Sequence, residues 1–164
     1  VINAVGFLHG EGIQPEKSIS RASTDAFFKN METNTLPTIL LAKHSRNLLK
    51  DSPNGFFTSI SAKVGSIEDN RLGGWYSYRA SKAALNMVLK TLSIEWAFAL
   101  PKCTVAALHP GTVVSQLSNP FTKQGNRKLF TPEDSASHLK KVLDNLRPQQ
   151  SGRFWSWDGS EIPW

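Results

Sequence analysis

The sequence is poor in cysteine: Cys103 is the only one in 164 residues. An internal disulfide is therefore excluded, and a lone thiol is consistent with a cytoplasmic location. No apolar run approaches the roughly 20 residues of a membrane-spanning helix, so we expect a soluble protein without a membrane span. Repeats and low-complexity tracts are also missing, which leaves one compact domain over residues 1–164 as the expected organisation.

Dense clusters of one charge are missing as well. The 19 basic and 13 acidic residues give a formal net charge of +6, but the basic residues are scattered. Because a nucleic-acid surface usually shows a basic run or stripe, we expect no nucleic-acid partner. The four histidines have no ligand spacing and predict no metal site. The chain starts with Val1 rather than methionine, and Val1 and Ile2 resemble the end of a strand, so we expect a fragment of a longer protein.

What the sequence does contain is a regular alternation of strand and helix patterns. Short apolar segments bounded by turn residues predict strands at 1–6, 56–61, 104–108 and 152–157. Longer segments predict helices over residues 24–50, from Gly73-Gly74 to Pro101, and from Pro132 to about Arg147. This order is typical of an α/β fold, a parallel sheet with helices on both faces.

The first of these helices is interrupted by Pro37. A proline has no amide hydrogen for the carbonyl four residues earlier, here Thr33, so we expect a kink beside Asn34. The kink either holds a water next to Asn34 or is purely structural, with Asn34 facing solvent. The apolar face of this helix is predicted to consist of Phe27, Phe28, Met31, Ile39, Leu40 and Leu48.

The central helix carries Tyr78 and Lys82, four residues apart and therefore on one face. A phenol with a pKa of about 10 is a poor base near neutrality, and a neighbouring ammonium lowers that pKa. Tyr78 is thus a candidate general acid or base. In parallel sheets ligands bind outside the carboxyl ends of the strands, where Asn3, Ser61 and the turn 110–115 are expected.

These residues resemble the short-chain dehydrogenase/reductase family over most of the chain. The matching segments are Asn3-Ala4-Val5-Gly6, Asn34, the Tyr78-x-x-x-Lys82 pair and Pro110-Gly111-Thr112-Val113 with Ser115. Within the family the chain is most similar to C-factor and sniffer-like carbonyl reductases, through Gly65-Ser66-Ile67, residues 76–86, His109-Pro110-Gly111 and the ending Trp157-Asp158-Gly159. The resemblance implies the C-terminal part of a Rossmann-like, doubly wound parallel sheet.

The resemblance also implies a function, the transfer of hydride between NADP(H) and a carbonyl or alcohol substrate, with NAD(H) as the alternative cofactor. It assigns catalytic roles to Asn34, Ser61, Tyr78 and Lys82, and cofactor binding to Asn3, Gly6, Tyr78, Lys82, Pro110, Gly111, Val113 and Ser115. The expected partner is a small molecule, and self-association stays open. The basic residues Lys123, Arg127 and Lys128 lie in the loop that covers substrate in this family. We interpret them as solvated, with attraction of an anionic substrate as the alternative. The alternatives are a non-catalytic binding or signalling protein and an inactive truncated product.

The sequence departs from the family pattern in two places. The glycine-rich nucleotide-binding loop is missing, and with it roughly 80 to 90 residues that the resemblance places upstream, so we expect this piece alone to be inactive. The second departure concerns the catalytic serine. Alignment on Gly65 puts Ala62 at the serine position, so Ser61 can serve only if the backbone has left the strand there, and Ser66 is the alternative.

Overall fold

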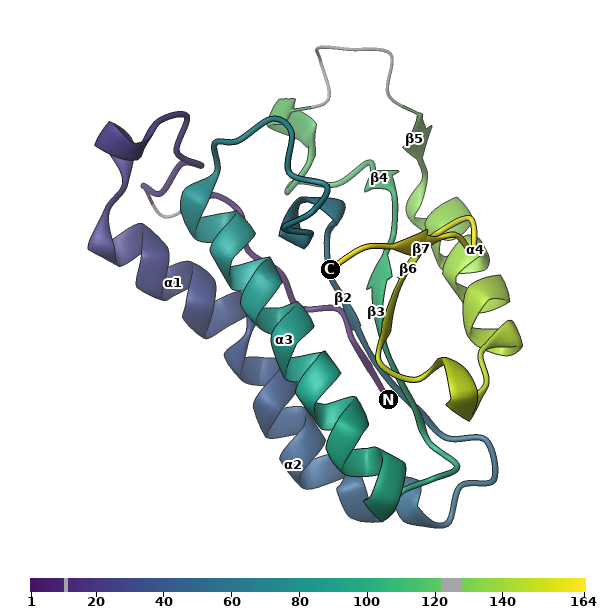
Figure 1. The fold of residues 1–164 in the computed structure, drawn as a ribbon. Coiled ribbons are helices and arrows are strands. Elements are labelled where there is room, and N and C mark those ends of the chain that lie inside the picture. The colour runs from purple at the N-terminus through teal and green to yellow at the C-terminus, as the bar shows by residue number, and fades with distance from the viewer. Residues whose placement is uncertain (11, 122–127) are drawn as a thin grey trace.

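The computed structural model describes residues 1–10, 12–121 and 128–164, so Lys123 and Arg127 lie outside the described residues. Its centre is a five-stranded sheet of order β1-β2-β3-β6-β7 (Figure 1). The first four strands are parallel, and β7 pairs antiparallel with β6; the strands are β1 (Ile2–Asn3), β2 (Phe56–Ile60), β3 (Thr104–His109), β6 (Arg153–Ser156) and β7 (Glu161–Ile162). The expected α/β fold with a Rossmann-like parallel sheet is confirmed.

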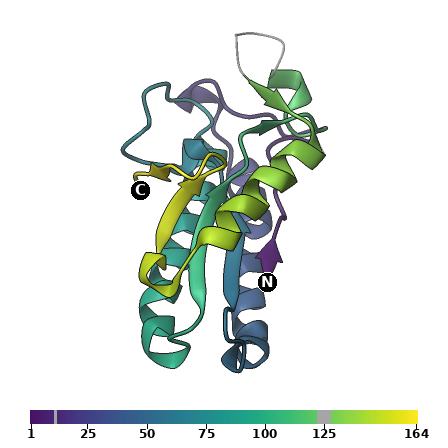
Figure 2. The same ribbon diagram turned by 90° about the vertical axis from the view of Figure 1, so that its right-hand side faces the viewer.

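Helices cover both faces of this sheet (Figures 1 and 2). One face carries α1 (Thr24–Asn34), α2 (Leu36–Lys50) and α3 (Tyr76–Ala99), and α4 (Pro132–Asn145) lies on the other. Side chains of β3 alternate between the two cores. Val105 and Ala107 belong to the cluster that contains Trp96 of α3, whereas Leu108 packs in the cluster of Val142 from α4. A strand buried on both faces is apolar throughout, which is why this segment was recognisable from sequence.

The first predicted helix is two helices, α1 and α2, separated at Thr35. The interruption was expected from Pro37, which occupies the first turn of α2. The predicted apolar face was wrong. Five of its six members are exposed, with fractions from 42% for Phe27 to 79% for Leu48, and the buried positions are small or polar: Ala26, Asn30, Asn34, Thr38, Ala42 and Ser45, with Leu49 as the one large apolar side chain.

Short elements gather beyond the carboxyl ends of the strands. They include the parallel pair β4 (Thr112–Val113) and β5 (Leu129–Phe130) and the 3-10 helices η1 (Ile19–Arg21), η2 (Lys63–Gly65) and η3 (Asn119–Phe121), whereas η4 (Pro148–Gln150) precedes β6. The hairpin of β6 with β7 was not predicted, because its second strand has only two residues. Within the described ranges, no helix combines the length and apolar character needed to cross a bilayer.

Candidate active site

The start of α3 places Tyr78 and Lys82 at the carboxyl ends of the strands. The helix begins at Tyr76, and its N-cap is Trp75, which follows Gly73 and Gly74. Tyr78 is 7% exposed and Lys82 is 2% exposed, and the Lys82 Nζ lies 5.8 Å from the centre of the Tyr78 ring. The same ammonium donates a hydrogen bond of 2.9 Å to the carbonyl of Ile60 at the end of β2. The structure therefore brings the phenol and the ammonium together beside the sheet.

Burial dominates the acid–base behaviour of this pair. It raises the pKa of Tyr78 above its ordinary value and lowers the pKa of Lys82 to about 8. The shift of the phenol is opposite to the one that the sequence led us to expect from a neighbouring cation, because desolvation outweighs an ammonium 5.8 Å from the ring. Tyr78 is protonated at neutral pH, as a phenol with an ordinary pKa also is, and this is the form that can give a proton to an oxygen.

Asn34 ends α1 next to this pair. Its Oδ1 accepts a hydrogen bond of 2.7 Å from the amide of Phe7, and its Nδ2 donates to the Phe7 carbonyl at 2.9 Å and to the Ser81 hydroxyl at 2.9 Å. The side chain is fully buried and does not face solvent. The amide of Thr38, which would reach the Asn34 carbonyl in a continuous helix, donates to the carbonyl of Thr35 instead. The break between α1 and α2 thus withholds the usual helical donor from the Asn34 carbonyl.

Asn3 ends β1 and has a supporting position. Its Nδ2 donates to the Thr38 hydroxyl at 2.9 Å, its Oδ1 accepts from the Val5 amide at 3.1 Å, and Thr38 in turn hydrogen-bonds to Ser59 at 3.0 Å. These bonds tie β1, α2 and β2 together and shape the turn that leads to Gly6. A β-carbon at Gly6 would lie 3.8 Å from the Lys82 Nζ and 4.0 Å from the Asn34 Oδ1. Gly6 is therefore adjacent to both groups.

The substrate contact expected of Ser61 stays a prediction, and the structure gives its hydroxyl a partner on α3. The backbone is still extended at Ala62, with φ −142° and ψ 143°, so successive side chains point to opposite sides. The Ser61 hydroxyl is buried and donates to the Asn86 Oδ1 of α3 at 2.6 Å. The alternative, Ser66, accepts a hydrogen bond of 3.1 Å from the Asp69 amide. Both serine hydroxyls therefore have structural partners, and the position that alignment assigned to the serine is Ala62.

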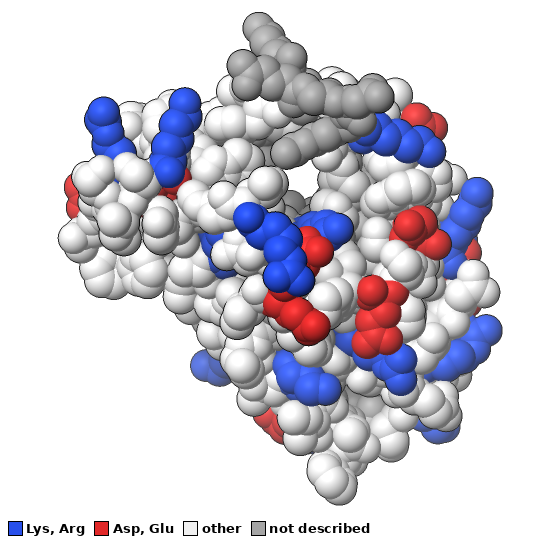
Figure 3. Space-filling view, turned by 45° about the horizontal axis from the view of Figure 1, so that its top comes forward, with Lys and Arg blue, Asp and Glu red and all other residues white. Residues whose placement is uncertain are grey.

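A cavity of about 990 Å³ connects most of the predicted residues. Its lining includes the following predicted residues: Gly6, Ser61, Tyr78, Lys82, Pro110, Gly111, Val113 and Ser115. Asn3, Asn34 and Ser66 are outside the lining, among the residues that the structure describes. Figure 3 views the molecule from this end and shows a hollow, near which basic and acidic side chains of the described residues are intermixed.

The turn 110–115 follows β3 and forms one side of the cavity. Gly111 has φ +77°, and a β-carbon there would lie 2.6 Å from the Phe130 ring, so the position requires glycine. The Ser135 hydroxyl at the start of α4 donates to the Pro110 carbonyl at 2.8 Å. His109, just before the turn, also lines the cavity, and burial together with the nearby Lys63 ammonium lowers its pKa to about 4. A neutral imidazole therefore faces the cavity.

Sequence reasoning missed Glu16 and Trp75. Glu16 comes from the polar loop before η1, is 3% exposed and contacts the first turn of α3, while Trp75 lines the cavity beside Tyr78. No local pattern marks a carboxylate that is buried by a helix 61 residues away. The Gly73-Gly74 pair was the only signal for an unusual backbone at Trp75.

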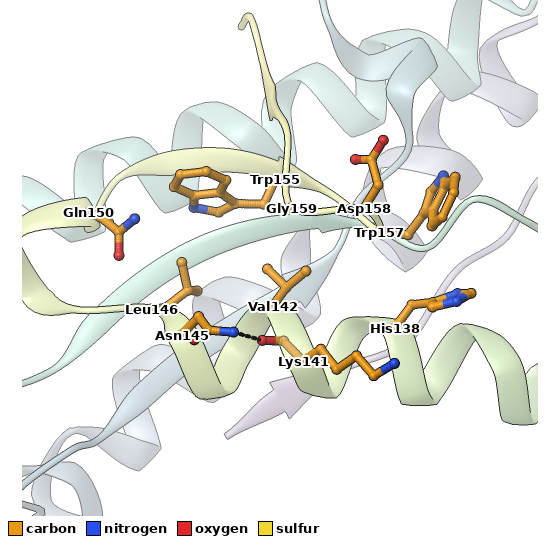
Figure 4. Close-up of a pocket in the computed structure, with 10 residues that line it drawn as sticks. All are labelled: His138, Lys141, Val142, Asn145, Leu146, Gln150, Trp155, Trp157, Asp158 and Gly159. Atoms are coloured by element: carbon orange, nitrogen blue, oxygen red, sulfur yellow. Dashed lines mark hydrogen bonds between the residues drawn. The ribbon is translucent and has the colours of Figure 1, made fainter.

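A second, smaller pocket of about 290 Å³ lies between α4 and the β6–β7 hairpin (Figure 4). Trp155 and Trp157 of the hairpin face His138 and Val142 of α4 across it. The Trp155 Nε1 is buried without a hydrogen-bond partner. None of the predicted site residues lines this pocket. In the described part of the chain, no group of three or more His, Cys, Asp or Glu side chains is placed to hold a metal ion.

Comparison with known proteins bears on this arrangement. Residues 2–126 match the family described as short chain dehydrogenase. The chain is 37% identical over 157 residues to 1-hydroxy-2-glutathionyl-2-methyl-3-butene dehydrogenase of Rhodococcus sp. (strain AD45). The aligned region covers 95% of this chain and 66% of that protein. The chain is also 38% identical over 106 residues to C-signal of Myxococcus xanthus, in an aligned region that covers 64% of this chain and 58% of that protein.

Solved structures agree. The carbonyl reductase Sniffer of D. melanogaster is similar with a TM-score of 0.84 at 27% identity, covering 99% of this chain and 65% of that one. The NADPH bound carbonyl reductase from chicken fatty liver has a TM-score of 0.85 at 28% identity, covering 99% and 64%. The chain spans 58% to 66% of the length of these four proteins. The expected similarity to C-factor and sniffer-like reductases is confirmed, and the chain belongs to the short-chain dehydrogenase family.

Proposed function

We propose that the gene product containing these residues is a nicotinamide-dependent oxidoreductase that interconverts a carbonyl group and an alcohol. The observation that carries the proposal is the position of Tyr78 and Lys82. Both are buried on one face of α3 at the carboxyl ends of the strands, and both line the large cavity. A proton donor beside a cavity of this size, about 990 Å³, is what the reduction of a small carbonyl compound requires.

The residues present are compatible with the nicotinamide and ribose portion of such a cofactor. The missing side chain of Gly6 leaves space beside the Lys82 ammonium and the Asn34 amide. The left-handed Gly111 lets the 110–115 turn line the same cavity. We propose NADP as the cofactor, because the similar carbonyl reductase from chicken fatty liver is described as NADPH bound; NAD is the alternative.

Each residue of the site then has a chemical task. A bound nicotinamide supplies the hydride. Tyr78 donates the proton to the substrate oxygen, and its raised pKa keeps the proton in place until charge develops there. Lys82 holds the ribose hydroxyls and, when charged, stabilises the phenolate that remains. The carbonyl of Asn34, without its usual helical donor, binds a water that returns a proton through Lys82.

We assign no substrate contact to Ser61 in this scheme, because its hydroxyl donates a hydrogen bond to the Asn86 Oδ1. Its task is to fix the end of β2 against α3, the helix that carries Tyr78. The neutral His109 lies on the lining of the cavity and is available as a hydrogen-bonding group there. The site therefore stabilises the developing oxyanion mainly through the phenol.

The proposal is tested with Tyr78→Phe and the matched control Tyr76→Phe, which alters an exposed phenol two residues earlier on the same helix. Loss of the general acid is expected to lower the turnover of small aldehydes or quinones at least a hundredfold, while the affinity for NADPH changes less than about threefold. Tyr76→Phe should match the parent. Equal turnover in Tyr78→Phe and the parent would disprove the role of Tyr78.

A second function is favoured by Ala62. Alignment leaves no hydroxyl at that position, and the Ser61 hydroxyl donates to Asn86, which supports a site without a serine donor to the substrate. We therefore also consider a protein that binds the cofactor without turnover, in a binding or signalling role. Titration of the purified gene product with NADPH, followed by addition of aldehydes and quinones, separates the two: saturable binding without NADPH oxidation supports the binding protein.

A further inference from the structure

Trp75 has an unusual backbone at the edge of the proposed site. With φ 54° and ψ 44° it is left-handed, and it is the only non-glycine residue of the described chain with a positive φ. This conformation costs a bulky side chain about 1 kcal/mol or more and persists only where the surrounding structure holds it. Gly73 and Gly74 are also left-handed, with φ of 61° and 66°. Three successive residues thus turn the chain sharply before α3 begins.

Buried Glu16 holds this turn from one side. Its backbone carbonyl accepts the Trp75 amide at 2.5 Å, and its carboxylate accepts the Ser77 amide at 3.2 Å and the Ser77 hydroxyl. The carboxylate therefore satisfies donors in the first turn of α3, where the helix dipole also favours a negative charge. Arg79 holds the other side, since its guanidinium donates to the carbonyls of Gly73 at 3.0 Å and Gly74 at 2.9 Å.

The result of this support is the position of the Trp75 indole. Its ring meets the Tyr78 ring edge-to-face at 6.2 Å and the Phe121 ring at 5.0 Å. All three rings line the large cavity, together with Leu8 and Leu72. Tyr78, the proton donor of the proposed reaction, is therefore part of an aromatic wall formed by the rings of Trp75, Tyr78 and Phe121. The residues that hold this wall in place, Glu16 and Arg79, are not members of it.

We propose that Trp75 is a specificity-determining residue, against which a flat aromatic group next to the substrate carbonyl packs, and that Glu16 is the positioning residue that holds Trp75. The inference rests on the proposed reductase function and adds the substrate class: carbonyl compounds whose carbonyl carbon bears an aromatic ring. Such a ring gains from packing against an indole beyond its area burial, and a saturated ring of similar size does not.

The test uses two inert ligands, benzamide and cyclohexanecarboxamide, whose binding to the full gene product with NADPH is measured by calorimetry. Trp75→Asn removes the indole but tolerates the left-handed backbone, and Trp75→Phe keeps a ring. We expect Trp75→Asn to weaken benzamide about tenfold and cyclohexanecarboxamide less than threefold, with Trp75→Phe within threefold of the parent for both. Equal losses of affinity for both ligands in Trp75→Asn, or no preference for benzamide in the parent, would overturn the proposal that Trp75 binds an aromatic group.

Activity supplies an independent readout. With benzaldehyde, Trp75→Asn should raise KM about tenfold and change kcat less than threefold. If the parent binds benzamide selectively but reduces no aldehyde, the reductase proposal fails while the aromatic wall stands.

The role of Glu16 is tested by a double-mutant cycle. Glu16→Gln should weaken benzamide about threefold in the parent and have no further effect in Trp75→Asn. An equal effect in both backgrounds would show that Glu16 does not act through Trp75.

Discussion

Lys82 is expected to destabilise the folded protein, and replacing it should show by how much the free energy of unfolding changes. The residue is 2% exposed, and burial lowers its pKa from 10.5 to about 8. A difference of about 2.5 pKa units between the unfolded and folded states corresponds to about 3 kcal/mol of lost stability at pH 7. Lys82→Met keeps much of the side-chain volume and removes this cost. It also removes the hydrogen bond to the Ile60 carbonyl, worth about 1 kcal/mol, so we expect a net gain of about 2 kcal/mol.

The pH dependence gives the sharper test. Between pH 8 and 10.5 the unfolded chain keeps the Lys82 proton that the folded chain has already released, so the parent becomes more stable as pH rises. Its deficit relative to Lys82→Met should shrink by about 2 kcal/mol from pH 7 to pH 9.5. Urea unfolding of both proteins at several pH values measures this change. Lys43→Met, which alters an exposed lysine of α2, is the control and should follow the parent.

Parallel stability profiles of the parent and Lys82→Met over this range would refute the reasoning, whatever their offset, because the offset contains contributions that do not depend on pH. Lys82→Met should meanwhile lack turnover if the proposed function holds. The buried charge of Lys82 destabilises the fold and is needed for the proposed turnover, so its replacement should give a stabilised but inactive variant.

Three further predictions follow from single contacts. Gly111→Ala should cost about 2 to 4 kcal/mol in urea unfolding because of the Phe130 ring, whereas Gly159→Ala, with a similar φ of +83° and open space, should cost about 1 kcal/mol. Cys103 is buried and its pKa is raised to about 11, so iodoacetamide at pH 8 should label it only after unfolding. Ser61→Ala should cost about 1 kcal/mol and change turnover less than tenfold; a hundredfold loss would restore the expected substrate contact.

Most of the fold could be predicted because its signals are local. The strands β2 and β3 are short, mostly apolar segments bounded by turn residues, and Pro101 and Pro132 limit the helices. Tyr78 and Lys82 share a face because the helical repeat alone decides it. The residues at strand ends converge because parallel strands end at the same edge of the sheet. None of these inferences depends on the tertiary contacts of an individual side chain.

The errors occurred at positions where tertiary contacts decide which side chains are buried. Phe28 and Leu48 were assigned to the buried face of the first helix because they are apolar, yet they are 63% and 79% exposed. The buried face carries Asn30 and Thr38, whose side chains hydrogen-bond to the Ala26 carbonyl and to Asn3. Short side chains allow the helices to lie close to the sheet and to each other, and their hydrogen bonds offset the loss of water. Hydrophobicity alone misses a polar interior of this kind.

The serine shows the same difficulty at the scale of one residue. Sequence alignment left Ser61 and Ser66 as candidates, since it cannot tell whether a strand continues for one residue more. The backbone is extended at Ala62, and the hydroxyl of Ser61 donates to the Asn86 Oδ1. If catalysis needs a hydroxyl at this edge, Ala62→Ser should supply it and raise turnover, with Ser61 unchanged. No gain would mean that the phenol of Tyr78, whose pKa burial raises, is sufficient as the donor to the substrate oxygen.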